Sequence, residues 1–267
     1  MELVHIWCDA SLPHGRTNRL PFVGTMTRRT PLAAAVALAT LVGCGSGPTP
    51  LPHEPIAPAV ASSASQLALP PATHHAPEEL DPSLAIARAP EVFFADFTTS
   101  KGDFVVEVHR AWAPNGADRF YNLVKLGFYD DNRFFRAIPD FMAQFGIPGD
   151  PQVTAKWRHA SFADDPPVQS NLRGFVSFAR TGEPNSSATQ IFVSFENHPG
   201  LDASGFAPFG KVARGMEVVD DLYKGYGEGA PNGAGPDQHR IETEGNAYLD
   251  REFPKLDRIL SARIVPQ

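Results

Sequence analysis

Short strand-like runs, separated by turn residues, dominate the sequence after residue 90. Runs of β-branched and aromatic residues occupy 92–97, 104–108, 134–138, 141–145, 175–179, 190–195, 209–213 and 259–265. Two helical patterns lie far apart along the chain, at 114–127 and 215–224, with a further helical turn near 246–251. Pro114 suits the start of the first helix and Gly127 its end. This order of elements predicts a mainly β fold, a closed β-barrel capped by helices.

The segment before these strands has a different composition. Residues 45–90 are rich in Pro, Ala and Ser, have almost no aromatic residues and show no periodic apolar face. Such a segment buries too little apolar surface to offset the entropy of ordering it. We therefore expect a disordered N-terminal region, in which 45–90 forms an extended tether. The predicted domain follows at 91–267, with a C-terminal extension from about residue 225.

The first 44 residues have the layout of an export leader. Met26 is followed by Arg28 and Arg29, then by an apolar run at 32–42 and by Gly-Cys-Gly-Ser from residue 43. The run is about 11 residues long, whereas a membrane-spanning helix needs about 20. Residues 1–25 fit no part of a signal pattern, so Met26 is the expected start of the protein.

The sequence Leu-Val-Gly-Cys ending at Cys44 resembles the lipobox of bacterial lipoproteins. This resemblance implies cleavage before Cys44 and acylation of its thiol. The expected location is the bacterial cell envelope, on the periplasmic side, anchored to a membrane by lipid. Gly45 lacks the acidic retention signal known for lipoproteins, which favours the outer membrane. The alternative is an uncleaved apolar segment in which the cysteine is incidental.

Composition excludes several other classes of function. The formal net charge is −7 and no cluster of Lys and Arg lies in the body of the chain, so a nucleic-acid partner is not expected. The glycine-rich segment 225–235 lacks the Gly-Lys-Ser/Thr ending of a phosphate loop. Neither Cys8 nor Cys44 lies in the predicted domain, so no disulfide can stabilise it. No metal or other cofactor is expected, and the domain is expected to be a monomer.

Residues 134–146 are the most informative segment. They read Phe-Phe-Arg-Ala-Ile-Pro-Asp-Phe-Met-Ala-Gln-Phe-Gly, with one cation, Arg136, among aromatic residues. Gln144 lies eight positions later, an even separation on strands in which alternate residues share a face. Two further strand-like segments, 174–180 and 188–193, follow, and the second again combines a glutamine with phenylalanine.

In order, spacing and residue type these segments resemble the cyclophilin family of peptidyl-prolyl cis-trans isomerases. The pattern Phe-x-Arg-x-Ile-Pro-x-Phe-Met-x-Gln-x-Gly is highly specific, and the resemblance covers about residues 92–224. It implies a closed eight-stranded β-barrel capped by two α-helices. It also implies that Arg136 is catalytic and that proline-containing polypeptides are the substrates. It further implies a set of substrate-binding residues: Phe141, Met142, Gln144, Ala179, Arg180, Gln190, Phe192, Leu201 and Phe206.

Four positions depart from the family pattern. Asp140 replaces a usual Gly, and Arg180 replaces an Asn whose backbone meets the peptide. Gly200 takes the place of a Trp or Phe, and Phe206 that of a His or Tyr. These changes put cyclosporin sensitivity in doubt and predict modest turnover.

Two other functions stay open at this point. One is an envelope-anchored chaperone or adaptor that grips proline segments with weak catalysis. The other is a structural lipoprotein whose tether matters more than its binding site. The leading hypothesis is an isomerase that accelerates X–Pro rotation in exported proteins.

Overall fold

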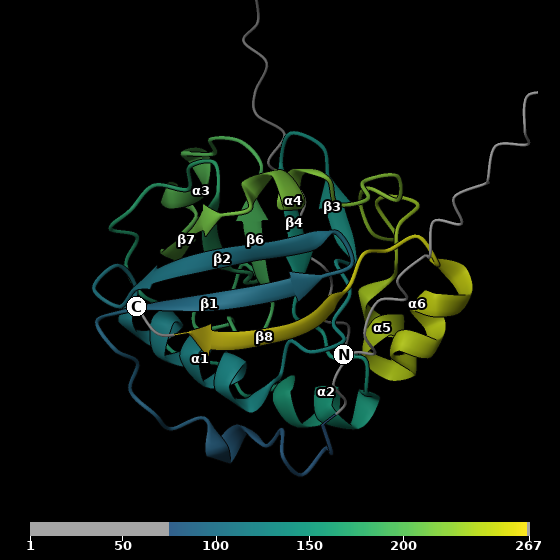
Figure 1. Cartoon of the computed structure of the whole chain (residues 1–267), viewed down its shortest axis with the longest axis horizontal. Helices are drawn as coiled ribbons and strands as arrows, with labels where there is room; N and C mark the ends of the chain where they lie inside the picture. Colours follow the sequence, from purple (N-terminus) through teal and green to yellow (C-terminus); the bar gives the residue numbers. More distant parts are fainter. Residues whose placement is uncertain (1–74, 266–267) are drawn as a thin grey trace, which may run out of the picture. The chain divides into compact units, whose positions relative to one another are not determined.

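The computed structural model describes residues 75–265 (Figure 1). The predicted leader 1–44 with Cys44, and the predicted tether as far as residue 74, lie outside these residues. The described strands are β1 (Val92–Thr99), β2 (Gly102–His109), β3 (Arg136–Ile138), β4 (Met142–Phe145), β5 (Phe175–Phe178), β6 (Ile191–Ser194), β7 (Pro208–Arg214) and β8 (Ile259–Val265). The helices are α1 (Pro114–Leu126), α2 (Pro151–Trp157), α3 (Gly200–Ala203), α4 (Met216–Asp220), α5 (Gln238–Glu244) and α6 (Asn246–Glu252), with a 3-10 turn at Pro82–Leu84.

All eight strands form one antiparallel sheet in the order β3-β4-β6-β5-β7-β2-β1-β8. The expectation of a closed barrel is wrong, because the sheet is a curled half-barrel that stays open between β3 and β8. Just before β3 and β8 begin, an isolated antiparallel bridge between Arg133 and Arg258 joins the two segments that lead into these strands. The outer edge of β3 is occupied instead by a later loop, through a bridge between Ala137 and Gly227. Since β3 has only three residues, this loop leaves no room for a ladder to β8.

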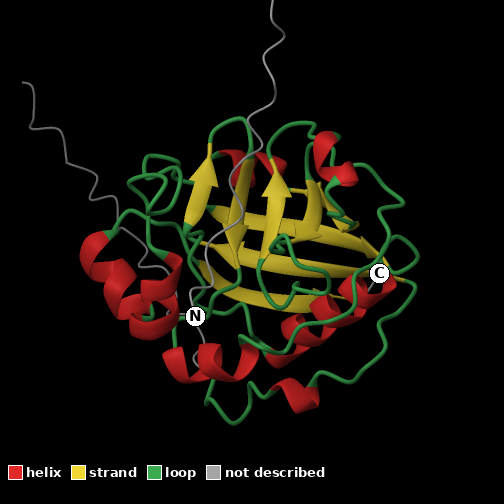
Figure 2. Cartoon of the chain, turned by 180° about the vertical axis from the view of Figure 1, so that it is seen from behind, coloured by secondary structure: helices red, strands yellow, loops and turns green. Residues whose placement is uncertain are grey.

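Alternation along the strands directs the hydrophobic core to the concave side of the sheet. In β1 every second residue is buried, including Phe93, Ala95 and Phe97, because alternate side chains of a strand point to the same face. The Phe97 ring stacks on Phe104 of β2 with centroids 4.8 Å apart. The buried face of α1, including Phe120, packs onto the same core, and Figure 2 shows this helix below the strands from behind.

The helices agree only in part with the sequence-based expectation. Helix α1 ends as predicted, because Gly127 has a φ of 72° and its N–H bonds back to carbonyls of the last turn. Helix α4 stops at Asp220, four residues earlier than predicted. The sequence analysis missed α2, α3 and α5. These are short, and α5 buries a single residue, Ile241, so their apolar pattern is weak.

The last residues of the predicted tether pack against the domain. The Trp157 indole donates to the carbonyl of Leu80 at 2.6 Å, and Asn122 exchanges two hydrogen bonds with the backbone of Ala87. Leu80 itself is buried. The packed part of the described chain therefore begins upstream of Glu91.

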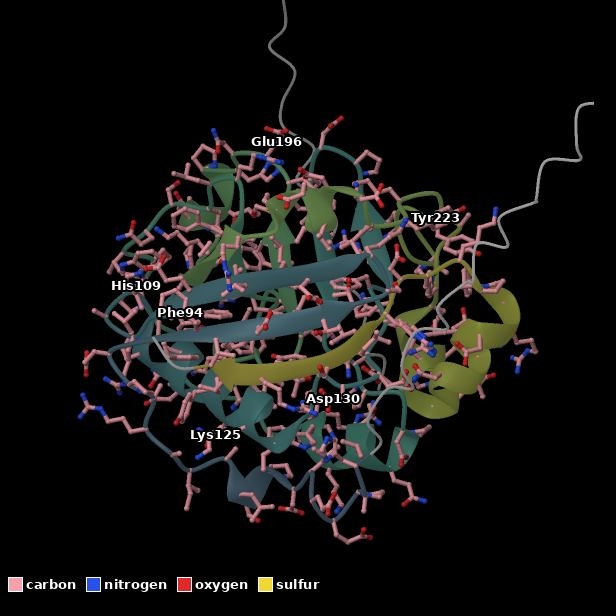
Figure 3. The ribbon with its side chains drawn as sticks, viewed as in Figure 1. Phe94, His109, Lys125, Asp130, Glu196 and Tyr223 are labelled. Carbon is pink, nitrogen blue, oxygen red and sulfur yellow. The ribbon has the colours of Figure 1, made fainter. Side chains whose placement is uncertain are left out.

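Strand β8, at the C-terminal end of the described residues, is held by the segment that follows α1. Asp130 lies beside β8 (Figure 3), where its carboxylate accepts hydrogen bonds from the Ala262 amide and the Arg263 guanidinium at 2.8–2.9 Å. Among residues 75–265 no helix combines the length and the apolar character needed to cross a bilayer.

The C-terminal extension forms a small core of its own beside the sheet, and Figure 1 shows α5 and α6 together there. Its buried residues come from three parts of the chain: Phe135, Ile147, Ile241, Tyr248 and Leu249. On its surface Arg240 bonds to both Glu244 and Glu252, and Arg251 adds further contacts to the same two carboxylates.

This charge network predicts a pH dependence of the α5–α6 pair. Hydrogen bonds, first from Arg240 and then from Arg251, lower the pKa of Glu252 from its usual 4.5 to about 2. A carboxylate with a lowered pKa stabilises the folded state above its unfolded pKa, and this contribution is lost as the pH falls through the folded value. We therefore expect NMR signals of α5 and α6 to broaden or shift between about pH 4.5 and 2.

The variant Glu252→Gln should weaken this transition, because only Glu244 of the two carboxylates then titrates, whereas Glu217→Gln, on the exposed surface of α4, should leave it unchanged. Unchanged α5 and α6 signals down to pH 2 in the unsubstituted protein would contradict the assignment.

Candidate active site

Strands β3, β4 and β6 carry different chemistry on their two faces. Alternate residues on the concave face, such as Ala143 and Val193, belong to the main hydrophobic core. The opposite face presents Arg136, Met142, Gln144 and Phe192. Because alternate side chains of a strand share a face, the pairing of β3 with β4 and of β4 with β6 brings these four side chains together on this face.

The guanidinium of Arg136 is buried and donates hydrogen bonds to Gln144 and Glu228. Arg136 pairs with Gln144 across β3 and β4, and its Nη1 donates to Gln144 Oε1 at 3.0 Å. Its Nε and Nη2 donate to Oε1 and Oε2 of Glu228, each at 2.6 Å. Gln144 Nε2 in turn donates to Gln190 Oε1 at 2.7 Å. A continuous chain of hydrogen bonds thus runs from Glu228 through the guanidinium to Gln190.

An apolar cluster adjoins this guanidinium. Its buried members are Met142, Phe192, Leu201 and Phe206, and Ile138 and the half-buried Phe141 pack at its border. The Met142 sulfur lies 3.9 Å from Nη1 of Arg136, and the guanidinium lies 5.9 Å from the Phe141 ring centroid. The structure therefore places a fixed cation at the edge of an aromatic and aliphatic surface.

Polar contacts behind the cluster hold its loop in place. The Asn171 amide donates to the carbonyl of Phe206 at 2.9 Å and to Asp202 at 2.8 Å, and Ser177 donates to Asn171 at 2.8 Å. Burial alone would raise the pKa of Asp202, but hydrogen bonds from Ser170 and Asn171 outweigh it and lower the pKa below its usual value. Asp202 thus stays ionised and continues to accept from the segment that supports Phe206.

Phe141 is oriented by a turn and by a histidine. Asp140 has a φ of 59°, in the left-handed region where Gly is favoured and Asp is tolerated. This conformation explains why a Gly would be usual there. His198 Nε2 lies 3.1 Å from the Phe141 carbonyl oxygen, and the two rings meet edge to face with centroids 5.1 Å apart.

The other expected substrate-binding residues lie at the margins. The Ala179 amide donates to the carbonyl of Gln190 at 2.8 Å, next to the hydrogen-bonded chain. The Arg180 side chain turns away to the carbonyl of Gly205 and to Asp164, both at 3.1 Å, so its charge is paired outside the site. A Cβ at Gly200 would meet nothing within 4 Å, and the wall is open at that position.

Sequence reasoning missed two residues of this site, Glu228 and His198. His198 follows β6 in a loop and has no motif of its own. Glu228 lies 92 residues after Arg136, and the glycine-rich segment around it contains no motif that assigns a role to this carboxylate. Spatial proximity over such a separation is not visible in a single sequence.

The hydrogen-bonded chain predicts a stability effect at Gln144. Gln144→Leu keeps the approximate shape but leaves Arg136 Nη1 and Gln190 Oε1 without this partner in a buried site. We expect the free energy of unfolding to fall by about 1–3 kcal/mol, measured by urea denaturation. Gln152→Leu, on the exposed face of α2, is the control and should change it by less than about 0.5 kcal/mol. Equal effects of the two substitutions would contradict a structural role for the chain.

Comparison with known proteins places this geometry in a family. Residues 94–243 match the family model described as cyclophilin type peptidyl-prolyl cis-trans isomerase/CLD. Peptidyl-prolyl cis-trans isomerase A of Dickeya dadantii is 36% identical over 137 residues, covering 47% of this chain and 68% of that protein. Peptidyl-prolyl cis-trans isomerase-like 3 of Rhizopus delemar is 36% identical over 133 residues, covering 46% of this chain and 77% of that protein.

A solved structure supports the fold. A cyclophilin type peptidyl-prolyl cis-trans isomerase from Cryptosporidium parvum superposes with a TM-score of 0.50 at 22% identity, covering 66% of this chain and 99% of that one. The family itself is shown by the match of the family model across more than half of the chain and by the two relatives at 36% identity, each covered over more than two thirds of its length. The chain belongs to the cyclophilin-type peptidyl-prolyl cis-trans isomerases.

Proposed function

We propose that Arg136 is the catalytic residue of this isomerase and that the adjoining apolar cluster binds the proline ring of a polypeptide substrate. The observation that carries the proposal is the position of a buried guanidinium on the same sheet face as the cluster, 3.9 Å from the Met142 sulfur. Apolar side chains suit a proline ring, and a cation at their border reaches the amide that enters it.

The chemistry of X–Pro rotation needs such a donor. The rotation barrier of a peptide bond is about 18–20 kcal/mol because resonance gives the C–N bond double-bond character. As the amide twists, resonance is lost and the prolyl nitrogen regains a lone pair. A donor aimed at this nitrogen stabilises the twisted state more than either planar state, which is the condition for catalysis. Arginine stays protonated at neutral pH, so it acts by hydrogen bonding and charge and not as a general acid.

The remaining site residues receive binding roles in this proposal. Phe141, Met142, Phe192, Leu201 and Phe206 enclose the proline ring. The polar side chains of Gln144 and Gln190 and the backbone of Ala179 and Arg180 contact the substrate main chain. The domain acts as a monomer, because one copy supplies all of these groups.

Substitution of the arginine tests this proposal. Arg136→Ala should lower kcat/KM for a proline-containing tetrapeptide at least tenfold, about 1.4 kcal/mol of transition-state stabilisation. NMR exchange spectroscopy measures both the cis–trans rate and the shifts caused by binding. Arg173→Ala, which breaks the exposed pair of Arg173 with Asp220, serves as the control and should keep full activity.

The same measurement separates the alternatives. Equal exchange rates for Arg136→Ala and the unsubstituted protein would refute catalysis by this residue. Peptide shifts without accelerated exchange in the unsubstituted protein would favour a proline-binding chaperone or adaptor. The observation that favours this second function is the missing side chain at Gly200, where an added Cβ would meet no atom within 4 Å.

We further propose that the protein is an envelope lipoprotein that acts on exported polypeptides, anchored through Cys44 on the periplasmic side, at the outer membrane. The support is the order of basic residues, apolar run and Leu-Val-Gly-Cys in the sequence. Lipoproteins of this type carry more than one acyl chain, and stable anchoring needs more than a single chain. The tether would then extend the domain away from the membrane surface.

The two cysteines of the chain allow a matched test of anchoring. In a Gram-negative host, Cys44→Ser should move the full-length protein from the membrane fraction to the soluble fraction and abolish incorporation of a labelled fatty acid. Cys8→Ser, in the segment that precedes the expected start at Met26, should behave as the unsubstituted protein, whether or not that segment is translated. Membrane association and labelling that survive Cys44→Ser would exclude the lipid anchor.

A further inference from the structure

We propose that Glu228 is a positioning residue, which holds the guanidinium of Arg136 in the orientation that reaches the prolyl nitrogen. The inference rests on the proposed catalytic role of Arg136. It assigns a function to the glycine-rich segment 225–235 and to the C-terminal extension, neither of which lines the apolar cluster.

The contacts of Arg136 fix the guanidinium plane from two edges. Both oxygens of Glu228 accept from the Nε and Nη2 edge at 2.6 Å, while Gln144 accepts from Nη1 at 3.0 Å. A bidentate carboxylate–guanidinium pair is stronger than a neutral hydrogen bond, and it fixes the plane of the guanidinium relative to the plane of the carboxylate. Gln144 accepts from one nitrogen only, so it fixes the orientation of the guanidinium plane less completely than the two oxygens of Glu228 do.

Burial explains why the guanidinium needs this partner. The side chain of Arg136 is 3% exposed and that of Glu228 is 26% exposed, so the carboxylate lies between the cation and solvent. A buried charge that loses its partner is strongly destabilised. Without Glu228 we expect the guanidinium to move toward water, and its donors would then leave the border of the apolar cluster.

The glycines around Glu228 have a steric function. Gly227 bridges to Ala137, the neighbour of Arg136 in β3, and the Gly229 amide donates to Glu228 Oε1 at 2.8 Å. The chain then folds back, and the Gly235 amide donates to the Glu228 carbonyl at 2.8 Å. A Cβ at Gly233 or Gly235 would come within 3.0 Å of that carbonyl oxygen, a distance that real Cβ atoms essentially never show. The segment is rich in glycine because it wraps the backbone of Glu228.

The extension anchors this loop to the strand that carries Arg136. The Asp237 amide donates to the Tyr248 hydroxyl at 3.0 Å, and the Tyr226 ring packs edge to face on Phe253 with centroids 5.0 Å apart. Phe135, next to Arg136 in sequence, is buried in the same small core as Tyr248. Figure 3 shows Tyr223, at the start of the loop, on the side of the sheet where α5 and α6 lie.

On charge alone Glu228 would lower the activity, since a carboxylate weakens the positive field that the guanidinium presents to the substrate. Orientation outweighs this loss, because the prolyl lone pair forms in one direction and only a donor already aimed there stabilises it without reorganisation. The sign of the activity change on removing the carboxylate therefore decides between positioning and inhibition.

The test compares Glu228→Gln with Glu228→Asp and with a matched control. Glu228→Gln keeps the size of the side chain and removes the charge and one accepted hydrogen bond. We expect it to lower kcat for a proline tetrapeptide about tenfold with KM within twofold, and Glu228→Asp to recover part of the loss. Glu242→Gln is the control, because Glu242 pairs with Arg158 at 3.2 Å and its side chain is 24% exposed. It should leave kcat unchanged.

A double-mutant cycle separates positioning from a general loss of structure. In the Arg136→Ala background Glu228→Gln should have no further effect on kcat, because the residue acts through Arg136. The Nε–H NMR signal of Arg136 should shift or broaden in Glu228→Gln while amide signals of the core stay in place. The thermal midpoint of each variant shows whether the fold is retained.

The outcomes are distinct from those for the proposed function. Loss of activity in Arg136→Ala together with full activity in Glu228→Gln overturns the positioning role alone. Higher activity in Glu228→Gln overturns it in favour of inhibition. Equal losses from Glu228→Gln in the presence and absence of Arg136 overturn it in favour of a structural role. Full activity in Arg136→Ala refutes the catalytic role of the arginine itself.

Discussion

The ion pair between Arg136 and Glu228 joins the two parts of the described domain. Arg136 lies on a three-residue strand at the edge of the sheet, and Glu228 lies in the loop between α4 and α5. The pair brings the loop against the outer edge of β3, and the bridge between Ala137 and Gly227 completes the contact. A buried cation at a sheet edge would be costly by itself. The carboxylate offsets part of that cost, and the loop that carries it covers the edge of β3.

The same pair explains why the sheet is not closed by strand pairing. A protein can cover an exposed strand edge with a loop instead of another strand. Here the glycine-rich loop takes the edge of β3, while β8 ends the sheet at the other side. The small core around Tyr248 supports that loop, so the C-terminal extension continues the architecture of the sheet and is not an independent appendage.

The side chains of the proposed active site are held in fixed positions by paired strands and by buried hydrogen bonds. Strands β3, β4 and β6 hold Arg136, Gln144 and Phe192 in register. Helix α3 supplies Leu201 and the loop after it supplies Phe206, and both are held by the polar contacts of Asn171 with Asp202 and with the Phe206 carbonyl. A donor fixed at the border of an apolar surface needs no nucleophile, because X–Pro rotation makes and breaks no covalent bond.

Much of this protein was predictable from the sequence, since its strands and site follow from local patterns. The eight strand segments, the start and end of α1 and the grouping of Arg136 with Gln144 all depend on period-two alternation or on turn residues within short stretches. Short helices such as α2 and α5 have too few buried residues to leave a pattern. The open edge of the sheet, the paired side chain of Arg180 and the contact of Glu228 with Arg136 were decided by tertiary structure. Each depends on residues far apart in the chain, whose proximity arises only when the sheet curls and the extension folds against it.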